Sequence, residues 1–422
     1  MNGSHEAQAT VREPVRVNRT DSQESPRRLA RGWNLDAVEE RWQVLSQTAE
    51  VQAELADGQT LARLNRYRLN VENIVGSVKV PLGVAGPLRV NGRFARGDYF
   101  LPLATSEAAL VASYNRGAQM LTQAGGCRTA VLREGIRRAP GFVFRDLTEV
   151  ERFLAWLPAQ LEELKRTVQS TTAHGRLKGM DLTVEGNHVY AGFEFLCGDA
   201  AGQNMITIAA EAICAFIQAN SPVKPEACYV EANFSGDKKA CALSFQTVRG
   251  RRVCAEAVLP AASVEEWLHT TPAEMAKCWA VGAMGGVLSG TIGIQAHYAN
   301  GLAALFIACG QDVACVAEAS VGVTRFEVTA QGDLYSCVTL PSLVVGTVGG
   351  GTGLPSQKAC LELMGLAGPG HANAFAEVCA GVCLAGELSI IGALCSGEFT
   401  RAHLRLARDR NGLVSDGEKS DG

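Results

Sequence analysis

The sequence of 422 residues lacks a surplus of charge of either sign, because 39 Lys and Arg residues are balanced by 43 Asp and Glu residues. A chain without clustered basic residues has no general attraction for nucleic acid or anionic lipid. The sequence also contains no C-x-x-C pair and no Cys/His cluster, although it has 14 cysteines. Scattered cysteines in a long chain are typical of small buried side chains in a reducing compartment. We therefore expect no metal site and no nucleic-acid partner.

The first residues lack the apolar core of a signal peptide, and charged or polar residues interrupt each later apolar run short of a membrane span. We therefore expect a cytoplasmic protein that binds no membrane. Residues 1–32 and 409–422 are polar and offer little bulky surface to bury, so both are predicted to be disordered tails.

The sequence is rich in small and apolar residues, with 45 glycines and 47% hydrophobic residues. This composition is typical of a folded enzyme, and the length exceeds what one hydrophobic core usually organises. We expect an α+β protein in which a helical region, residues 33–70, precedes a large domain of residues 71–138 and 230–408. Apolar residues at near-helical spacing on both sides of Asp57-Gly58 predict the helices of the first region.

A smaller module, residues 139–229, is predicted as an insertion in the large domain. Its segments alternate between strand and helix patterns in the order β-α-β-β-α-β, from GFVFRD to ACYVEANF. That order is typical of a ferredoxin-like module, in which helices cover one face of an antiparallel sheet.

Besides Glu107, which is placed at a predicted helix N-terminus, four places in the sequence could carry chemistry. Glu107 follows Thr105 and Ser106, either of which can cap a helix, so Glu107 is predicted to lie in a first helical turn. SGDKKACALSF places two lysines in a turn leading into a strand, although such lysines are usually only solvated. CGQDVAC places Asp312 in apolar surroundings, where an ionised carboxylate needs a cation or a function.

GTVGGGTG offers backbone N–H groups to a phosphate, although glycine-rich turns are more often merely tight turns without a ligand. His403 is a lone histidine on a basic helix, and such residues are usually structural or solvated.

The order of the motifs carries more information than any one of them. Over residues 35–408 the sequence resembles class I 3-hydroxy-3-methylglutaryl-CoA reductases in the blocks ENIVGSVKVPLGVAGPL, LPLATSEAALVASYNRG, DAAGQNM, GDKKA, CGQD, GTVGGGT and AGELS…HLRLAR. The resemblance implies that residues 139–229 bind the nicotinamide cofactor and that the active site forms at the interface of a homodimer or a dimer of dimers. Residues 72–76 would belong to that interface. The implied reaction reduces the acyl-CoA thioester to mevalonate and free coenzyme A with two NADPH.

The resemblance also implies roles for individual residues. Lys238 would stabilise the oxyanion, His403 would protonate the CoA thiolate and Glu107 would protonate the final alkoxide. Asp312 would lie between Lys238 and Glu107, so that the three titrate as one unit. The implied substrate-binding residues are Arg138, Glu231, Asn233, Lys239, His297 and Asn300. The implied cofactor-binding residues are Asp199, Ala200, Gly202, Gln203, Asn204, Gly346, Thr347, Val348, Gly349 and Arg408.

Three departures from the family pattern bear on specificity. Glu231 replaces a serine near the acyl carboxylate, and the lysine that binds this carboxylate in the family is absent around Val281. Either Glu231 pairs with Arg138 or points away while another cation compensates, so that the usual substrate still binds, or the acyl-CoA substrate lacks the free carboxylate or carries another group there. Ala173 replaces an arginine for the cofactor 2′-phosphate, which leaves NADH as the alternative to NADPH. A non-catalytic CoA- or nucleotide-binding homologue is a further alternative, and phosphoryl transfer is the least favoured.

Overall fold

The computed structural model describes residues 29–399, and the chain divides between Val78 and Lys79 into two compact units. Most of both predicted tails lies outside the described residues, as do His403 and Arg408.

The first unit is a small group of helices. They are α1 (Leu35–Leu45), α2 (Ala49–Leu55), α3 (Gly58–Leu61) and the 3-10 turn η1 (Leu64–Arg66). Asp57 begins α3 as its N-cap and accepts from the backbone N–H groups of Gln59 and Thr60, so the predicted break at Asp57-Gly58 is confirmed. Arg41 is fully buried and donates to the carbonyl oxygen of Ile74 at 2.7 Å. Helix α1 therefore fixes the backbone of the 72–76 segment.

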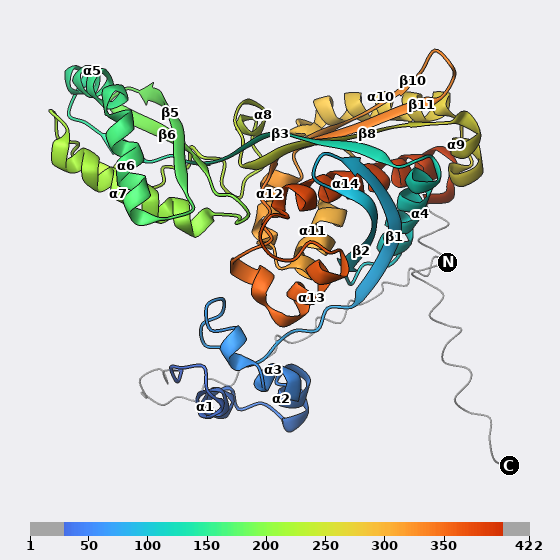
Figure 1. Ribbon diagram of the computed structural model, residues 1–422, viewed down its shortest axis with the longest axis horizontal. Coiled ribbons are helices and arrows are strands. Elements are labelled where there is room, and N and C mark those ends of the chain that lie inside the picture. Colours follow the sequence, from blue (N-terminus) through green and yellow to red (C-terminus); the bar gives the residue numbers. More distant parts are fainter. Residues whose placement is uncertain (1–28, 400–422) are drawn as a thin grey trace, which may run out of the picture. The chain divides into compact units, whose positions relative to one another are not determined.

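One mixed sheet organises the described part of the second unit (Figure 1). Its strands are β1 (Leu82–Gly92), β2 (Arg96–Ala104), β3 (Cys127–Arg138), β4 (Gly141–Val143), β5 (Arg176–Glu185), β6 (His188–Leu196), β7 (Ala227–Tyr229), β8 (Gly250–Leu259), β9 (Gly293–Ile294), β10 (Gly322–Val328) and β11 (Leu334–Leu343). The main path runs β7-β4-β6-β3-β8-β11-β10-β9, while β1 pairs with β2 and β3, and β5 pairs with β6. Buried and less buried residues alternate along β8, as expected where one sheet face meets a core.

The helices of the second unit surround this sheet. They are α4 (Leu110–Gln123), α5 (Leu147–Trp156), α6 (Leu161–Thr171), α7 (Gln203–Asn220), α8 (Leu243–Gln246), α9 (Ala261–Leu268), α10 (Pro272–Ser289), α11 (Tyr298–Cys309), α12 (Val316–Ala319), α13 (Pro355–Leu363) and α14 (Ala372–Cys395). The α+β fold class expected from the sequence is confirmed.

Helix α14 is the centre of the core (Figure 1). It packs against β8, β11, α4 and α11, and nearly all of its side chains are buried. A Cβ atom at Gly117 of α4 would overlap the carbonyl oxygen of Ala385, so glycine permits the close approach of α4 and α14. By length and composition α14 could cross a membrane, although Glu377 and Glu387 interrupt its apolar sequence as expected. Its burial identifies it as a core helix.

Residues 139–229, the predicted insertion, follow the expected β-α-β-β-α-β order, with strands β4, β5, β6 and β7. Their spatial order is β7-β4-β6-β5, and every pair is antiparallel. The single long helix expected after β4 is divided into α5 and α6 by the 3-10 turn η2 (Leu157–Gln160). Pro158 lies in that turn and has no N–H group to continue the helical hydrogen bonds.

Two local expectations are wrong. Helix α4 begins only at Leu110, after Ala109 with a φ of 68°, so Glu107 precedes the helix instead of lying in its first turn. Thr105 accepts from the backbone N–H of Glu107 at 3.0 Å and does not cap α4. The segment after the two lysines forms the helical turn α8, not a strand.

Candidate active site

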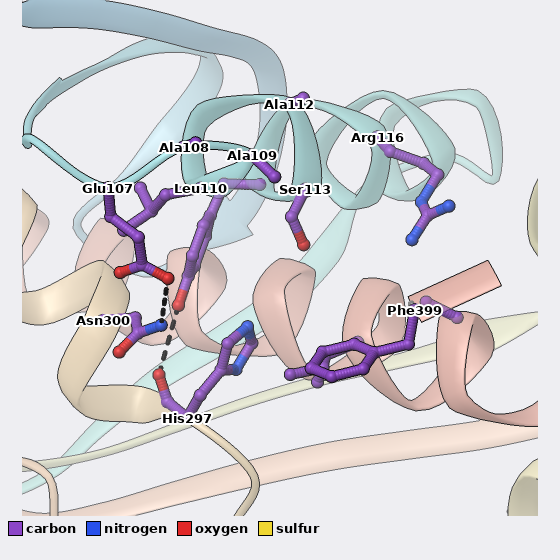
Figure 2. A pocket seen from close by; sticks show the side chains of 13 residues that line it. Glu107, Ala108, Ala109, Leu110, Ala112, Ser113, Arg116, His297, Asn300 and Phe399 are labelled. Atoms are coloured by element: carbon purple, nitrogen blue, oxygen red, sulfur yellow. Dashed lines mark hydrogen bonds between the residues drawn. The ribbon is translucent and has the colours of Figure 1, made fainter. Parts of the chain in front are cut away.

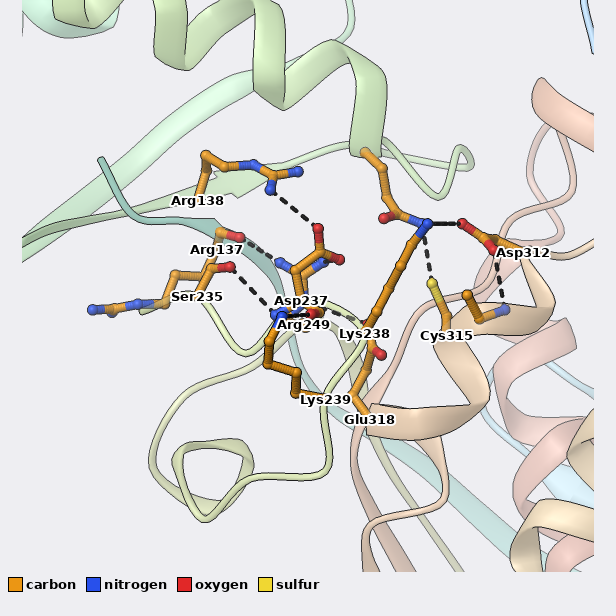
Figure 3. A network of polar contacts seen from close by, with 12 residues as sticks. Arg137, Arg138, Ser235, Asp237, Lys238, Lys239, Arg249, Asp312, Cys315 and Glu318 are labelled. Atoms are coloured by element: carbon orange, nitrogen blue, oxygen red, sulfur yellow. Dashed lines mark hydrogen bonds and ion pairs between the residues drawn. The ribbon is translucent and has the colours of Figure 1, made fainter. Parts of the chain in front are cut away.

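A lysine–aspartate ion pair stands at the centre of the candidate site (Figure 3). Nζ of Lys238 lies 2.9 Å from Oδ2 of Asp312, and both side chains are partly exposed. The hydrogen bond from Lys238 to Asp312 raises the pKa of the lysine. Burial is the largest single influence on Asp312 and opposes its ionisation, but the hydrogen bond and positive charge of Lys238, together with hydrogen bonds from Ala314 and Gln203, lower the pKa of the carboxyl. Both groups are therefore charged at neutral pH.

A network of arginines and carboxylates holds the loop that carries Lys238 (Figure 3). Nη2 of Arg249 donates to Oδ1 of Asp237 at 2.6 Å, and Nη1 of Arg138 donates to Oδ2 at 3.1 Å. Nε of Arg249 also lies 3.5 Å from Oε1 of the fully buried Glu318, whose pKa is raised by burial. Lys238 itself has a φ of 54°, a conformation that persists only where its surroundings hold it. The two arginines on Asp237 supply that restraint.

The cations expected at the acyl carboxylate have protein partners. Nη1 of Arg138 donates to Oε2 of Glu231 at 3.0 Å, so the pairing of these two residues is confirmed. Nζ of Lys239 donates to the carbonyl oxygen of Asp237 at 3.0 Å. Asn233 lies exposed on the same stretch with a φ of 62°. This end of the site is therefore close to charge-balanced without a ligand.

A cavity of about 360 Å³ lies beside α4 and the start of α11 (Figure 2). Glu107, His297 and Asn300 all line it. Oε1 of Glu107 accepts from Nδ2 of Asn300 at 3.2 Å, as Figure 2 shows. The ring of His297 stacks on that of Tyr114, with the ring centres 5.5 Å apart. The structure thus brings one predicted acid and two predicted acyl-binding residues into one mostly apolar cavity.

Glu387 positions His297, and sequence reasoning missed it. This carboxylate on α14 is buried and accepts from the backbone N–H of His297 at 2.9 Å. Nδ1 of His297 lies 3.3 Å from the same oxygen, Oε1, and Oε2 accepts from the hydroxyl of Thr324 at 2.7 Å. The available signal was an acidic residue within a long apolar helix, because a buried carboxylate is rarely without partners.

Helix α11 separates the cavity from the ion pair. Asn300 lies in its first turn, and Asp312 follows its last residue, Cys309, by three positions. At 1.5 Å per residue, these ends are roughly 15 Å apart. Within the part of the chain that the structure describes, no hydrogen bond or ion pair joins Glu107 to Lys238 or Asp312. The expected unit of Glu107, Asp312 and Lys238 is therefore not assembled within one chain.

Two loops expected to bind the cofactor lie together. The backbone N–H of Thr347 donates to the carbonyl oxygen of Asp199 at 2.9 Å, and Ala200 forms a parallel bridge with Val348. A Cβ at Gly346 would lie 2.5 Å from the backbone nitrogen of Ala201, so only glycine fits this crossing. The remaining glycines expected here, Gly202 and Gly349, both have positive φ.

Other contacts tie these loops to the core. Arg251 is buried and donates to the carbonyl oxygens of Val345 at 2.9 Å and Gly198 at 2.7 Å. The carboxylate of Asp199 accepts from the backbone N–H groups of Gly370 and Ala372, at the start of α14. Asp199 thus caps the core helix, where a negative charge is favourable.

Two further residues of the cofactor set begin α7. Asn204 is exposed there, whereas the side chain of Gln203 contacts Asp312. Among residues 29–399, no group of three or more His, Cys, Asp or Glu side chains is arranged to hold a metal ion.

The chain is similar in sequence to a known protein family. A family model described as hydroxymethylglutaryl-coenzyme A reductase matches residues 37–408. The 3-hydroxy-3-methylglutaryl-coenzyme A reductase of Pyrococcus horikoshii is 44% identical over 347 residues, covering 80% of this chain and 84% of that protein. The enzyme of the same name from Methanothermobacter thermautotrophicus is 40% identical over 375 residues, covering 88% of this chain and 94% of the relative.

A similar fold is found in the class II 3-hydroxy-3-methylglutaryl-CoA reductase of Streptococcus pneumoniae, which was solved bound to NADPH. The TM-score is 0.65 at 18% identity, and the match covers 84% of this chain and 96% of that one. The matches in sequence, together with this likeness in fold, lead to one conclusion: the chain belongs to the hydroxymethylglutaryl-coenzyme A reductase family.

Proposed function

We propose that this protein is an NADPH-dependent 3-hydroxy-3-methylglutaryl-CoA reductase of the class I type, which converts its thioester substrate to mevalonate and free coenzyme A. The observation that carries the proposal is the Lys238–Asp312 ion pair at 2.9 Å in a chain of this family. The class I assignment rests on the order of the sequence motifs.

Lys238 is the residue best suited to stabilise the developing negative charge. Addition of hydride to a thioester carbonyl places charge on the oxygen, and a fixed ammonium group stabilises that charge where it is greatest. Asp312 keeps the ammonium charged, and the arginines on Asp237 keep its loop in place. Lys238 therefore meets the oxyanion without having to reorganise.

The two proton transfers need separate donors. Release of coenzyme A leaves a thiolate, for which His403 is the proposed proton donor, although it lies outside the described residues. Reduction of the resulting aldehyde leaves an alkoxide, for which Glu107 is the proposed donor. Asn300 holds Oε1 of Glu107, which leaves Oε2 for the proton.

The two loops at Asp199 and Gly346 fit a dinucleotide. Their glycines let the backbone come close to a ligand, and α7 begins directly after the first loop. When bound, the reduced nicotinamide supplies the hydride for each step. The loops, anchored by the buried Arg251, would hold the cofactor in position, and NADPH is favoured, with NADH as the alternative.

A homodimer would unite the two halves of the site. Glu107 and Asp312 lie at opposite ends of α11, so a second copy must supply one of them if both act on one substrate. The second half of α10 carries exposed apolar side chains that are suited to an interface, namely Val281, Met284, Val287 and Leu288. This arrangement supports the proposal of an active site between two copies.

Spectrophotometry with the purified chain tests the function. We expect oxidation of two NADPH per 3-hydroxy-3-methylglutaryl-CoA, with release of one free thiol. Parallel assays with NADH settle the cofactor preference. No loss of cofactor absorbance with either nucleotide would exclude the usual substrate.

A different acyl-CoA is the second candidate, because Arg138 is paired with Asp237 as well as with Glu231. With Arg138 already bound to two carboxylates, a third carboxylate from the substrate would be poorly compensated. Glu231→Ser frees Arg138 from one of them. We expect this variant to lower the KM for 3-hydroxy-3-methylglutaryl-CoA if the native substrate lacks the free carboxylate, and to raise it if Glu231 serves the usual substrate. A panel of acyl-CoA thioesters distinguishes the two.

A further inference from the structure

Gln203 makes contacts that separate it from the rest of the cofactor segment. Its Nε2 lies 3.3 Å from Oδ2 of Asp312 and 3.1 Å from Sγ of Cys315. Gln203 is the first residue of α7, in the inserted module, whereas both of its partners follow α11 in the large domain. One side chain therefore joins the module to the catalytic ion pair.

The contact reaches the same oxygen that binds the lysine. Oδ2 of Asp312 accepts from Lys238 at 2.9 Å and from Gln203 at 3.3 Å, while Oδ1 accepts from the backbone N–H of Ala314. An ionised carboxylate can only accept, so the amide must present its nitrogen to it. Gln203 thus acts as a second, uncharged donor beside Lys238.

The position of Gln203 depends on the cofactor loops. The loop of residues 199–202 leads directly into α7, and its first two residues pair with Thr347 and Val348. Gly202, with a φ of 79°, is the N-cap that turns this loop into the helix. A movement of this loop is therefore transmitted to Gln203 within one residue.

We propose that Gln203 is a positioning residue that couples the cofactor-binding module to the catalytic pair, by holding Oδ2 of Asp312 in place for Lys238 when the module is docked. This inference rests on the proposed reductase function. Gln203 acts through Asp312 and need not touch the cofactor.

The charges around Asp312 determine what loss of Gln203 does. Lys238 faces the carboxylate from its loop, and Cys315 faces it from η3 (Val313–Cys315). Asp237 and Glu318 lie near Lys238 and Cys315, and Arg249 contacts both of these acids. No other change in charge accompanies removal of the amide, so the ionised form of Asp312 loses one donor. The acidic limb of the kcat profile should then move to higher pH.

Gln203→Leu removes the donor and keeps a similar volume, and Gln218→Leu on the exposed end of the same helix is the matched control. We expect Gln203→Leu to lower kcat by roughly three- to tenfold, as for loss of one hydrogen bond of typical net strength, since the contact with Asp312 is long at 3.3 Å. The KM for the acyl-CoA and the Kd for NADPH, measured by fluorescence titration, should remain within about twofold of the unaltered values. The control should match the unaltered chain in every respect.

Three results decide the matter. A shifted acidic limb with unchanged NADPH binding supports the coupling role. Weaker NADPH binding with an unchanged kcat profile overturns it and makes Gln203 a cofactor ligand. Unchanged kcat, pH profile and binding also overturn it, while turnover by the unaltered chain still supports the proposed function. If the unaltered chain shows no turnover, the proposed function itself fails.

Discussion

Two inactive variants should restore each other if the active site forms between subunits. Glu107→Gln removes the proposed proton donor, and Asp312→Asn removes the partner of Lys238. Each substitution is close to isosteric, and both parent side chains are partly or fully exposed, so folding should be little affected. Each variant alone should lose roughly 10²- to 10⁴-fold in kcat, the usual contribution of a positioned proton donor or its electrostatic support.

The expected recovery follows from the geometry of α11. Because Glu107 contacts the first turn of α11 and Asp312 follows its last turn, roughly 15 Å along the helix, one substrate would use Glu107 of one subunit and Asp312 of the other. In a two-fold symmetric mixed dimer, one site then carries both substitutions and the other carries neither. Random exchange makes half of the dimers mixed, so the pool should recover about one quarter of the unaltered activity.

The assay mixes the two variants in equal amounts, allows subunits to exchange through brief mild denaturation, and records NADPH oxidation over time. Each variant alone, taken through the same exchange procedure, is the control. Activity that stays at the level of the separate variants, although mixed dimers are shown by differential tagging, would refute the shared site.

The remaining predictions concern single positions. Lys238→Met should lower kcat by roughly 10²- to 10³-fold but cost less than about 1 kcal/mol of stability, because the ion pair is partly exposed. The loss of unfolding free energy in this variant should be greatest at pH values between the ordinary pKa values of aspartate and lysine. It should vanish in acid as Asp312 protonates and at high pH as Lys238 deprotonates, which denaturant titrations across pH can check. Gly346→Ala should raise the KM for NADPH and also lower Tm, because its Cβ would press on the crossing loop at Ala201. Steady-state kinetics measures the change in KM, and calorimetry measures the change in Tm. Leu288→Lys on the exposed face of α10 should shift the protein toward monomer in analytical ultracentrifugation and reduce activity in proportion.

The pairing of Lys238 with Asp312 could be predicted from the sequence. An aspartate in an apolar run needs a cation, and the motif order supplied one. The contacts of Gln203 and Glu387 could not be predicted from the sequence, because their partners Asp312 and His297 lie 109 and 90 residues away. Local pattern carries no information about contacts at such separations, so only the folded chain shows them.

The fold was predictable where one local rule dominated. The inserted module followed from alternating strand and helix patterns, since each segment has a clear period. The start of α4 could not be predicted, because Ala109 takes a positive φ that is unusual for alanine. Thr105 upstream was a plausible N-cap, so the helix was expected to begin too early. The separation of Glu107 from Asp312 likewise depends on the direction of α11, which composition cannot give.

Helix α14 also sets a limit on how this chain can change its length. Its first turn receives the carboxylate of Asp199, and its last turns place Ser389 against Arg116 and Ile390 in the cavity. One inserted residue between these ends would rotate one relative to the other by about 100° and lengthen the helix by about 1.5 Å. Insertions should therefore be tolerated at the hairpin tip near Gly332, where a turn joins β10 to β11, whereas α14 has to keep its residue count. The length of α14 therefore fixes the spacing between the cofactor loops and the acyl cavity.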